Sequence, residues 1–235
     1  MRICICDDDK CIHLLLKDNI SSFFCGKNMP EIIQCYSGAE TLGYFENDAA
    51  DIIFLDIELG DENGIDIAMN IRKKDKNAII IFISSHPQYV FDAFKCEAFH
   101  FLVKPITSTD FEDVFSRAMH KYRTENDNIA LGWNHTRSNI KIGDILYIEG
   151  YKRKLDIHTK HGTFSIIGKI SDAYSHLKDF DFILVHQGYI VNMKYIENFK
   201  NGEITLYNGE VVMVSVRKRA EAIMVYDKYI QKWKW

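Results

Sequence analysis

Short apolar runs alternate with amphipathic segments through the first half of the chain. Five of the runs have the length and composition of buried parallel strands. They lie at residues 3–6, 32–35, 52–56, 78–83 and 99–103. After each run, apolar residues recur at helical spacing, most clearly over 12–23 and 111–122. This alternation predicts an α/β doubly wound fold with a parallel five-stranded sheet.

Two polar clusters predict where helices begin. Ser37-Gly38-Ala39-Glu40 and Thr109-Asp110-Phe111-Glu112 both place an acidic residue three positions after a hydroxyl residue. In a capping box the hydroxyl accepts a hydrogen bond from the third residue of the helix. We therefore expect helices to start directly after Ser37 and Thr109.

The period changes from helical to alternating at about residue 129. Asn208-Gly209 separates two apolar runs and is the strongest hairpin signal in the chain. Only 169–178 and the last 18 or so residues have helical spacing, so a mostly antiparallel β domain is predicted. The polar stretch between the two patterns predicts a domain over 1–123, a linker over 124–129 and a β domain over 130–235. We expect Trp233 and Trp235 to pack against the β domain.

Charge divides the chain in the same place. Residues 1–123 carry 13 Lys and Arg against 20 Asp and Glu, a net −7, whereas residues 124–235 carry 16 against 13, a net +3. Two modules with different partners are implied. The small basic excess of the second half is weak support for nucleic acid on its own.

The chain has neither a long apolar run nor a signal sequence. No stretch of 18 apolar residues is present, and the first residues lack the charged and apolar regions of a signal peptide. We expect a cytoplasmic protein without a membrane partner. The six cysteines are expected to be free thiols, because a chain of 235 residues needs no disulfide framework.

Polar residues stand at the carboxyl ends of the predicted strands. Asp7 and Asp8 follow the first strand, and Asp56, Ser84 and Lys104 end or follow the third, fourth and fifth. Each alone is compatible with a simple strand end, but these ends meet at one edge of the sheet, where ligands bind. Three adjacent carboxylates repel one another unless a cation lies among them, and an oxygen-only set suits Mg²⁺. With Lys104 and Ser84 as donors, the set predicts phosphoryl transfer to an aspartate.

Basic residues gather in two predicted loops of the second half. Lys152-Arg153-Lys154 follows Tyr151, and Arg217-Lys218-Arg219 comes shortly after Ser215. Each cluster alone is equally compatible with a solvated turn. Basic side chains mixed with hydroxyl, amide and aromatic groups also suit phosphate contacts and the reading of base edges.

The first half resembles the receiver domain of bacterial response regulators. The motifs that carry the resemblance occur in order over residues 1 to about 123: Asp7-Asp8, Phe54-Leu55-Asp56, Asn63-Gly64, Ser84 and Lys104-Pro105. By this resemblance Asp56 is the phosphoacceptor and shares Mg²⁺ with Asp8 and the backbone carbonyl of Glu58, while Asp7 assists through water.

The same resemblance implies a phosphate-sensing switch. Lys104 corresponds to the phosphate-sensing lysine, and Ser84 and Phe101 to the hydroxyl and aromatic residues that rearrange on phosphorylation. The bond between Lys104 and Pro105 is expected to be cis. Two residues depart from the commoner pattern, since the hydroxyl is often threonine and the aromatic residue often tyrosine. Phe101 therefore has no hydroxyl to offer a partner.

The second half resembles the LytTR-type DNA-binding domain over about 130–230. The likeness is carried by residues 144–149, 185–192, 208–209 and 214–217. It implies a β domain that contacts successive major grooves through the loops 151–154, 186–189 and 215–219. The candidate DNA-binding residues are Lys152, Arg153, Lys154, Gln187, Ser215, Arg217, Lys218 and Arg219. Gln187 and Gly188 replace the charged and hydroxyl residues of the commoner motif, which alters one family contact.

Together the resemblances imply a two-component transcriptional regulator. A sensor histidine kinase would phosphorylate Asp56, the receiver would form a homodimer, and the β domain would bind double-stranded DNA at repeated half-sites. Its only chemistry would be self-phosphorylation and autodephosphorylation, so it is not expected to be an enzyme. Two alternatives stay open: a Mg²⁺-dependent aspartyl phosphatase of the haloacid-dehalogenase type, and a phosphorylation-dependent protein-binding module without DNA affinity.

Overall fold

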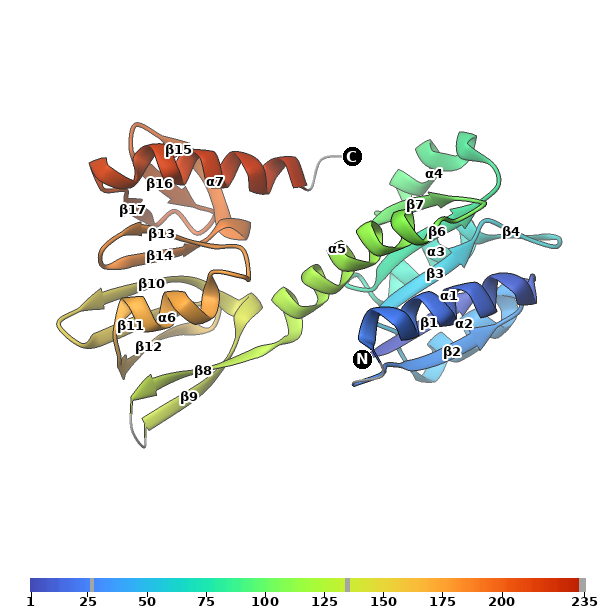
Figure 1. Cartoon of the computed structure of the whole chain (residues 1–235), viewed down its shortest axis with the longest axis horizontal. Helices are drawn as coiled ribbons and strands as arrows, with labels where there is room; N and C mark the ends of the chain where they lie inside the picture. Colours follow the sequence, from blue (N-terminus) through green and yellow to red (C-terminus); the bar gives the residue numbers. More distant parts are fainter. Residues whose placement is uncertain (26–27, 134–135, 233–235) are drawn as a thin grey trace. The chain divides into compact units, whose positions relative to one another are not determined.

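The computed structural model of the chain describes residues 1–25, 28–133 and 136–232 (Figure 1). It contains two compact units, Met1–Tyr122 and Arg123–Trp235. Trp233 and Trp235, which were predicted to pack against the β domain, lie outside the described residues. Within the described part of the chain, no helix has both the length and the apolar character needed to cross a membrane.

The first unit is built on one parallel five-stranded sheet, as predicted. Its strands are β1 (Arg2–Cys6), β2 (Glu31–Cys35), β3 (Ile52–Asp56), β6 (Ile79–Ser84) and β7 (His100–Val103). They lie in the order β2-β1-β3-β6-β7, and every neighbouring pair is parallel. The chain adds β2 on one side of β1 and then crosses over to add β3, β6 and β7 on the other side. The carboxyl ends of β1 and β3 therefore form the switch point at which ligands bind in doubly wound sheets.

Helices cover both faces of this sheet. They are α1 (Lys10–Phe24), α2 (Gly38–Asn47), α3 (Gly64–Lys74), α4 (Val90–Lys95) with the 3-10 turn η1 (Pro87–Tyr89), and α5 (Ser108–Asn126). Residues of α1 and α5 share one apolar core with the sheet, and residues of α2, α3 and α4 share the other. Because both faces are covered, all five residues of β3 are buried, which explains the unbroken apolar run.

One of the two predicted helix caps is confirmed and the other is wrong. The Ser37 hydroxyl accepts a hydrogen bond from the Glu40 amide at 3.2 Å. In α5, however, the Asp110 amide donates to the Thr107 hydroxyl at 3.1 Å, so the helix starts two residues before the expected position. Thr107, like Thr109, is followed by an acidic residue three positions later. Because Thr107 caps the helix, α5 is longer at its amino end than predicted. The turn-prone stretch after β3 forms a small hairpin of β4 (Glu58–Leu59) and β5 (Glu62–Asn63).

The second unit is mostly antiparallel β structure, as predicted. Its strands are β8 (Asn128–Trp133), β9 (Thr136–Lys141), β10 (Ile145–Tyr151), β11 (Lys154–Thr159), β12 (Gly162–Ile167), β13 (Phe182–His186), β14 (Tyr189–Asn192), β15 (Ile196–Lys200), β16 (Glu203–Leu206) and β17 (Val211–Met213). The sheet orders are β12-β11-β10-β14-β13, β15-β16-β17 and β8-β9. The helices are α6 (Ile170–Leu177) and α7 (Arg219–Lys232), and 3-10 turns lie at η2 (Ile142–Asp144), η3 (Met193–Tyr195) and η4 (Val216–Lys218).

The stretch predicted to be a linker, 124–129, is covered by the end of a helix and the start of a strand. Helix α5 continues to Asn126 and β8 begins at Asn128. Polar groups of this stretch bond within the second unit: the Lys194 ammonium lies 2.6 Å from a Glu125 carboxylate oxygen, and the Ile142 amide donates to the Asp127 carbonyl at 2.9 Å. Polar groups of Glu125 and Asp127 therefore have partners in the second unit.

Candidate functional site

Three carboxylates meet at the switch point of the parallel sheet. Asp7 follows β1, and Asp56 is the last residue of β3. One carboxylate oxygen from each of Asp7, Asp8 and Asp56 lies within 4.8 Å of the other two. Asp7 and Asp56 are buried, whereas Asp8 is exposed. The structure thus brings together the acidic residues that the sequence placed at separate strand ends.

Lys104 neutralises part of this charge. Its ammonium lies 2.7 Å from Asp56 Oδ2 and 2.8 Å from Asp7 Oδ2. Burial raises the pKa of Asp7, and the hydrogen bond from Lys104 opposes that rise. Burial alone would lower the pKa of Lys104, but the bonds to Asp56 and Asp7 together outweigh it and raise the pKa. When all four groups are ionised, the cluster keeps a net charge of −2, which favours a bound cation.

The other predicted residues of the first unit lie at the end of β6, on β7 and in the loop after β3. Ser84 ends β6, is fully buried, and accepts a hydrogen bond from the His86 amide at 3.0 Å. The Glu58 amide donates to Asp56 Oδ1 at 3.2 Å. The Glu58 side chain is instead 3.0 Å from the His86 ring. Phe101 is buried on β7 within the core that α2, α3 and α4 cover.

His13 supports the acidic loop and was not singled out from the sequence. Its Nε2 lies 2.8 Å from the Asp7 carbonyl, and because a carbonyl only accepts, Nε2 carries the proton. The ring is buried and lies against Tyr36, with 4.4 Å between ring centroids. His13 shares a helical face with Leu16 and Ile20, a spacing that indicates burial. The spacing does not reveal the hydrogen-bond partner.

Gly64 lets helix α3 begin directly beside Asp56. A Cβ at this position would lie 2.0 Å from the Asp56 carbonyl oxygen. The Gly64 amide donates to the Ile57 carbonyl at 2.8 Å, and the Asn63 side chain caps the helix. Any larger residue would push apart the strand end and the helix. This explains in physical terms why a glycine follows Asn63. The peptide bond between Lys104 and Pro105 is cis, as expected.

The three predicted DNA-contacting loops of the second unit are neighbours. Lys152 and Arg153 form the two-residue turn between β10 and β11. The Gly150 amide at the base of this hairpin donates to the Gly188 carbonyl at 2.8 Å, and the Ser215 amide donates to the Val185 carbonyl at 3.0 Å. Backbone hydrogen bonds therefore link the bases of the 151–154, 186–189 and 215–219 loops in series.

Contacts within the domain separate the candidate DNA-contacting residues into two groups. The side chains of Lys152, Arg153, Gln187 and Arg217 are exposed. Other candidates are bound within the domain. Lys154, although exposed, lies 2.9 Å from Asp156. A residue that is already paired has to break that contact before it can bind DNA.

The 215–219 loop is partly held by the fold. The Ser215 hydroxyl lies 3.4 Å from the Val185 carbonyl, and the Lys218 ammonium lies 2.7 Å from Glu221. The Arg219 guanidinium packs over Gly202, where a Cβ would lie 2.3 Å from its Nε. These contacts favour Arg217 as the residue of this loop that reaches a ligand.

Gly188 has a steric reason for departing from the commoner family motif. A Cβ at this position would lie 2.8 Å from the Gly150 carbonyl oxygen. The neighbouring Gln187 is exposed, while the His186 ring accepts a hydrogen bond from the Gly188 amide at 3.2 Å. The close approach of two loop backbones thus excludes the hydroxyl residue that is commoner there.

Comparison with known proteins identifies two domains in the same order. The model of the response regulator receiver domain matches residues 3–116, and that of the LytTr DNA-binding domain matches residues 136–224. The chain is 25% identical over 223 residues to the sensory transduction protein LytT of Bacillus subtilis, across 88% of this chain and 89% of that protein. It is 27% identical over 182 residues to the transcriptional regulatory protein LytR of Staphylococcus aureus, across 71% of this chain and 74% of that protein.

Solved structures that resemble the chain include the response regulator TrrA of Thermotoga maritima, determined in complex with Mg²⁺-BeF. The two chains are 29% identical, the match covers 50% of this chain and 97% of that chain, and the TM-score is 0.44.

The domain matches agree with the chemistry of the site. The cluster of Asp7, Asp8 and Asp56 is the acidic triad typical of the magnesium site of receiver domains. A receiver joined to a DNA-binding domain excludes the haloacid-dehalogenase alternative, and the chain is not a catalytic enzyme. The chain belongs to the LytTR-type response regulators, transcriptional regulators that combine a phosphorylatable receiver with a LytTR DNA-binding domain.

Proposed function

We propose that Asp56 is the phosphoacceptor and that its phosphorylation controls DNA binding by the second unit. The observation that supports this best is the meeting of Asp7, Asp8 and Asp56 within 4.8 Å, with Lys104 bonded to two of them. The receiver module would comprise residues 1–123, and the DNA-binding module residues 130–235.

The donor set of the acidic cluster fits Mg²⁺, which prefers carboxylate and carbonyl oxygens. Asp8, Asp56 and the backbone carbonyl of Glu58 would hold the ion, with Asp7 acting through water. When bound, the ion supplies positive charge that draws in a phosphorylated donor. The Glu58 side chain is occupied by His86 at 3.0 Å, which leaves its main chain as the group available to the site.

The transfer forms a bond between a carboxylate oxygen of Asp56 and phosphorus, and breaks the bond between phosphorus and its donor. For a sensor histidine kinase the leaving group is the imidazole of a phosphohistidine. The Lys104 ammonium, 2.7 Å from Asp56 Oδ2, is placed to bind a phosphoryl oxygen. The Ser84 hydroxyl accepts from the His86 amide, so its own proton is available for another phosphoryl oxygen.

New charge on Asp56 would change the packing of the receiver through Ser84 and Phe101. We propose that the changed surface supports a homodimer, which increases avidity for repeated half-sites in double-stranded DNA. DNA contacts are assigned first to Arg217, Gln187, Lys152 and Arg153, whose side chains are exposed. They are assigned second to Lys154, which is exposed but paired with Asp156, and to Ser215, Lys218 and Arg219. A regulator that binds the chromosome would act in the cytoplasm.

The test measures phosphate incorporation and DNA binding in the full chain. Wild type treated with acetyl phosphate and Mg²⁺ should gain one acid-labile phosphate, and Asp56→Asn should gain none. Asp61→Asn, which changes an exposed aspartate of the same loop, should behave like wild type. Duplexes selected from a random library should bind phosphorylated wild type more tightly than Asp56→Asn. Equal DNA affinity of the two proteins would refute the switch.

A further inference from the structure

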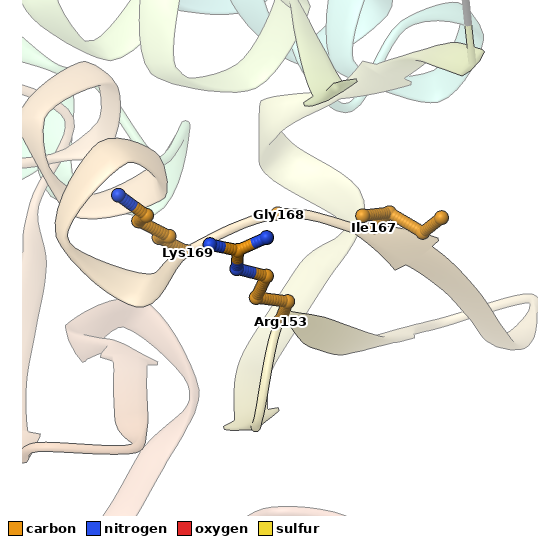
Figure 2. Close-up of a pocket in the computed structure, with 4 residues that line it drawn as sticks. All are labelled: Arg153, Ile167, Gly168 and Lys169. Atoms are coloured by element: carbon orange, nitrogen blue, oxygen red, sulfur yellow. The ribbon is translucent and has the colours of Figure 1, made fainter. Parts of the chain in front are cut away.

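A pocket lies beside the hairpin tip that carries Lys152 and Arg153. Its lining residues are Arg153, Ile167, Gly168 and Lys169, and its volume is about 80 Å³. Figure 2 shows the Arg153 guanidinium beside the Lys169 side chain, with Ile167 on the other side of Gly168. Two segments far apart in sequence therefore bring two basic side chains to one place.

The fold holds these segments together. Lys154 pairs with Ile167 in the β11–β12 ladder, and the Gly168 amide donates to the Arg153 carbonyl at 2.9 Å. This bond depends on a turn in which Lys152 and Arg153 adopt φ values of 55° and 95°. Asparagine and glycine adopt such values most cheaply. The chain instead places two long cationic side chains at this strained tip.

The lining of the pocket favours one kind of ligand. Two of the four lining residues are cationic and none is a carboxylate. Guanidinium and ammonium groups bind phosphate oxygens through charge-assisted hydrogen bonds. Ile167 is 57% exposed and forms an apolar rim. A sugar-phosphate unit presents an anion next to an apolar ring face, which matches this lining better than a free inorganic ion does.

We propose that this pocket binds one phosphate of the DNA backbone through Arg153 and Lys169, with the adjoining deoxyribose against Ile167. The inference rests on the proposed DNA-binding function and adds a fourth contact to the series of three loops. Arg153 belongs both to the 151–154 loop and to the pocket. The pocket therefore extends the row of three loops beyond the 151–154 loop. Phosphate contacts fix the register of a protein on DNA without reading its sequence.

Lys169→Gln in the full chain is the primary test. Lys178→Gln, at the other end of α6, is the matched control because its side chain is also exposed. Affinity is measured for a duplex selected from a random library and for an unselected duplex, over a range of salt concentrations. Lys169→Gln should weaken both affinities about 5-fold to 10-fold and reduce the salt slope by about 1. Lys178→Gln should change neither.

Arg153→Gly separates a ligand role from a structural role. Glycine accepts a φ of 95° without strain, so this variant should be at least as stable as wild type while it binds DNA more weakly. Loss of stability in Arg153→Gly would show that the residue serves the fold and would overturn the proposal.

Three further outcomes would also overturn it, and they are distinguishable. Unchanged affinity and salt slope in Lys169→Gln, with normal binding by wild type, would refute the phosphate contact alone. Absence of DNA binding by phosphorylated wild type would refute the proposed function together with the contact. Binding of inorganic phosphate that depends on Lys169, without an effect of the substitution on DNA affinity, would assign the pocket to a free anion.

Discussion

Replacement of Lys104 by methionine tests whether the acidic cluster is held together by one ammonium group. Lys104 bonds to Asp56 and Asp7 at 2.7 and 2.8 Å, and the side chains of these aspartates are only 6% and 1% exposed. Removing one partner of a buried ion pair costs about 3–5 kcal/mol, because the remaining charge is left without compensation. The Lys104 side chain is itself 18% exposed, so solvent screens part of the interaction and the lower limit of about 3 kcal/mol applies.

This loss of free energy should appear as a large fall in melting temperature. For a unit the size of Met1–Tyr122, a change of 1 kcal/mol shifts Tm by about 4 °C, so Lys104→Met should lower the Tm of the receiver by about 12 °C in EDTA. Calorimetry of the full chain is the suitable assay.

Magnesium and pH should both reverse the effect. A bound cation supplies the charge that the variant lacks, so saturating Mg²⁺ should raise the Tm of Lys104→Met more than that of wild type. Burial raises the pKa of Asp7, so the stability linked to its protonation is present at low pH and is lost as pH rises through that pKa. Without Lys104 the pKa should rise further, and the variant should recover stability when the pH is lowered from about 7 toward 5.

Lys76→Met is the control, since Lys76 is an exposed lysine of the same unit. A fall in Tm no larger than that of Lys76→Met, combined with an equal response to Mg²⁺, would refute the reasoning. It would show that the two aspartates do not depend on the ammonium for their stability.

Substitutions at three further positions test the packing around the two sites. Gly64→Ala should destabilise the receiver by about 1–3 kcal/mol and impair phosphorylation, because its Cβ would meet the Asp56 carbonyl; calorimetry and acetyl phosphate labelling would show this. Gly188→Ser restores the hydroxyl residue commoner in the family, yet its Cβ would clash with the Gly150 carbonyl oxygen. It should therefore lower the Tm of the second unit, measured by calorimetry. His13→Leu should cost about 1–3 kcal/mol by leaving the Asp7 carbonyl without its donor. His13→Gln should retain most of that stability, and equal losses in calorimetry would show that ring packing outweighs the hydrogen bond.

Features that follow from local pattern were predictable from the sequence. The run ending at Asp56 is apolar because both faces of β3 are covered, and the parallel order brings the strand ends to one edge. That reasoning was sufficient to name Asp7, Asp8 and Lys104 as members of one site. Asn208-Gly209 likewise fixes a hairpin by local backbone preference, and β16 and β17 flank it as expected.

Features that depend on contacts between distant residues were not predictable. Thr107 and Thr109 have the same cap spacing, and only the fold selects the first. The bond from His13 to Asp7 requires the end of β1 to lie against α1. Lys169 carries no motif, and its place beside Arg153 depends on the β11–β12 ladder. In each case the deciding partner has no signature in the neighbouring sequence.

The last turn of α5 determines where the chain can be cut to prepare the second unit alone. Glu125 binds Lys194 at 2.6 Å, and the Arg123 guanidinium lies 5.6 Å from the centre of the Phe180 ring. A fragment that starts at residue 130 would lose both contacts and the Asp127 carbonyl that accepts from Ile142. Fragments for spectroscopy or crystallisation should therefore begin at or before Arg123, inside a helix rather than at the polar stretch that looks like the natural boundary.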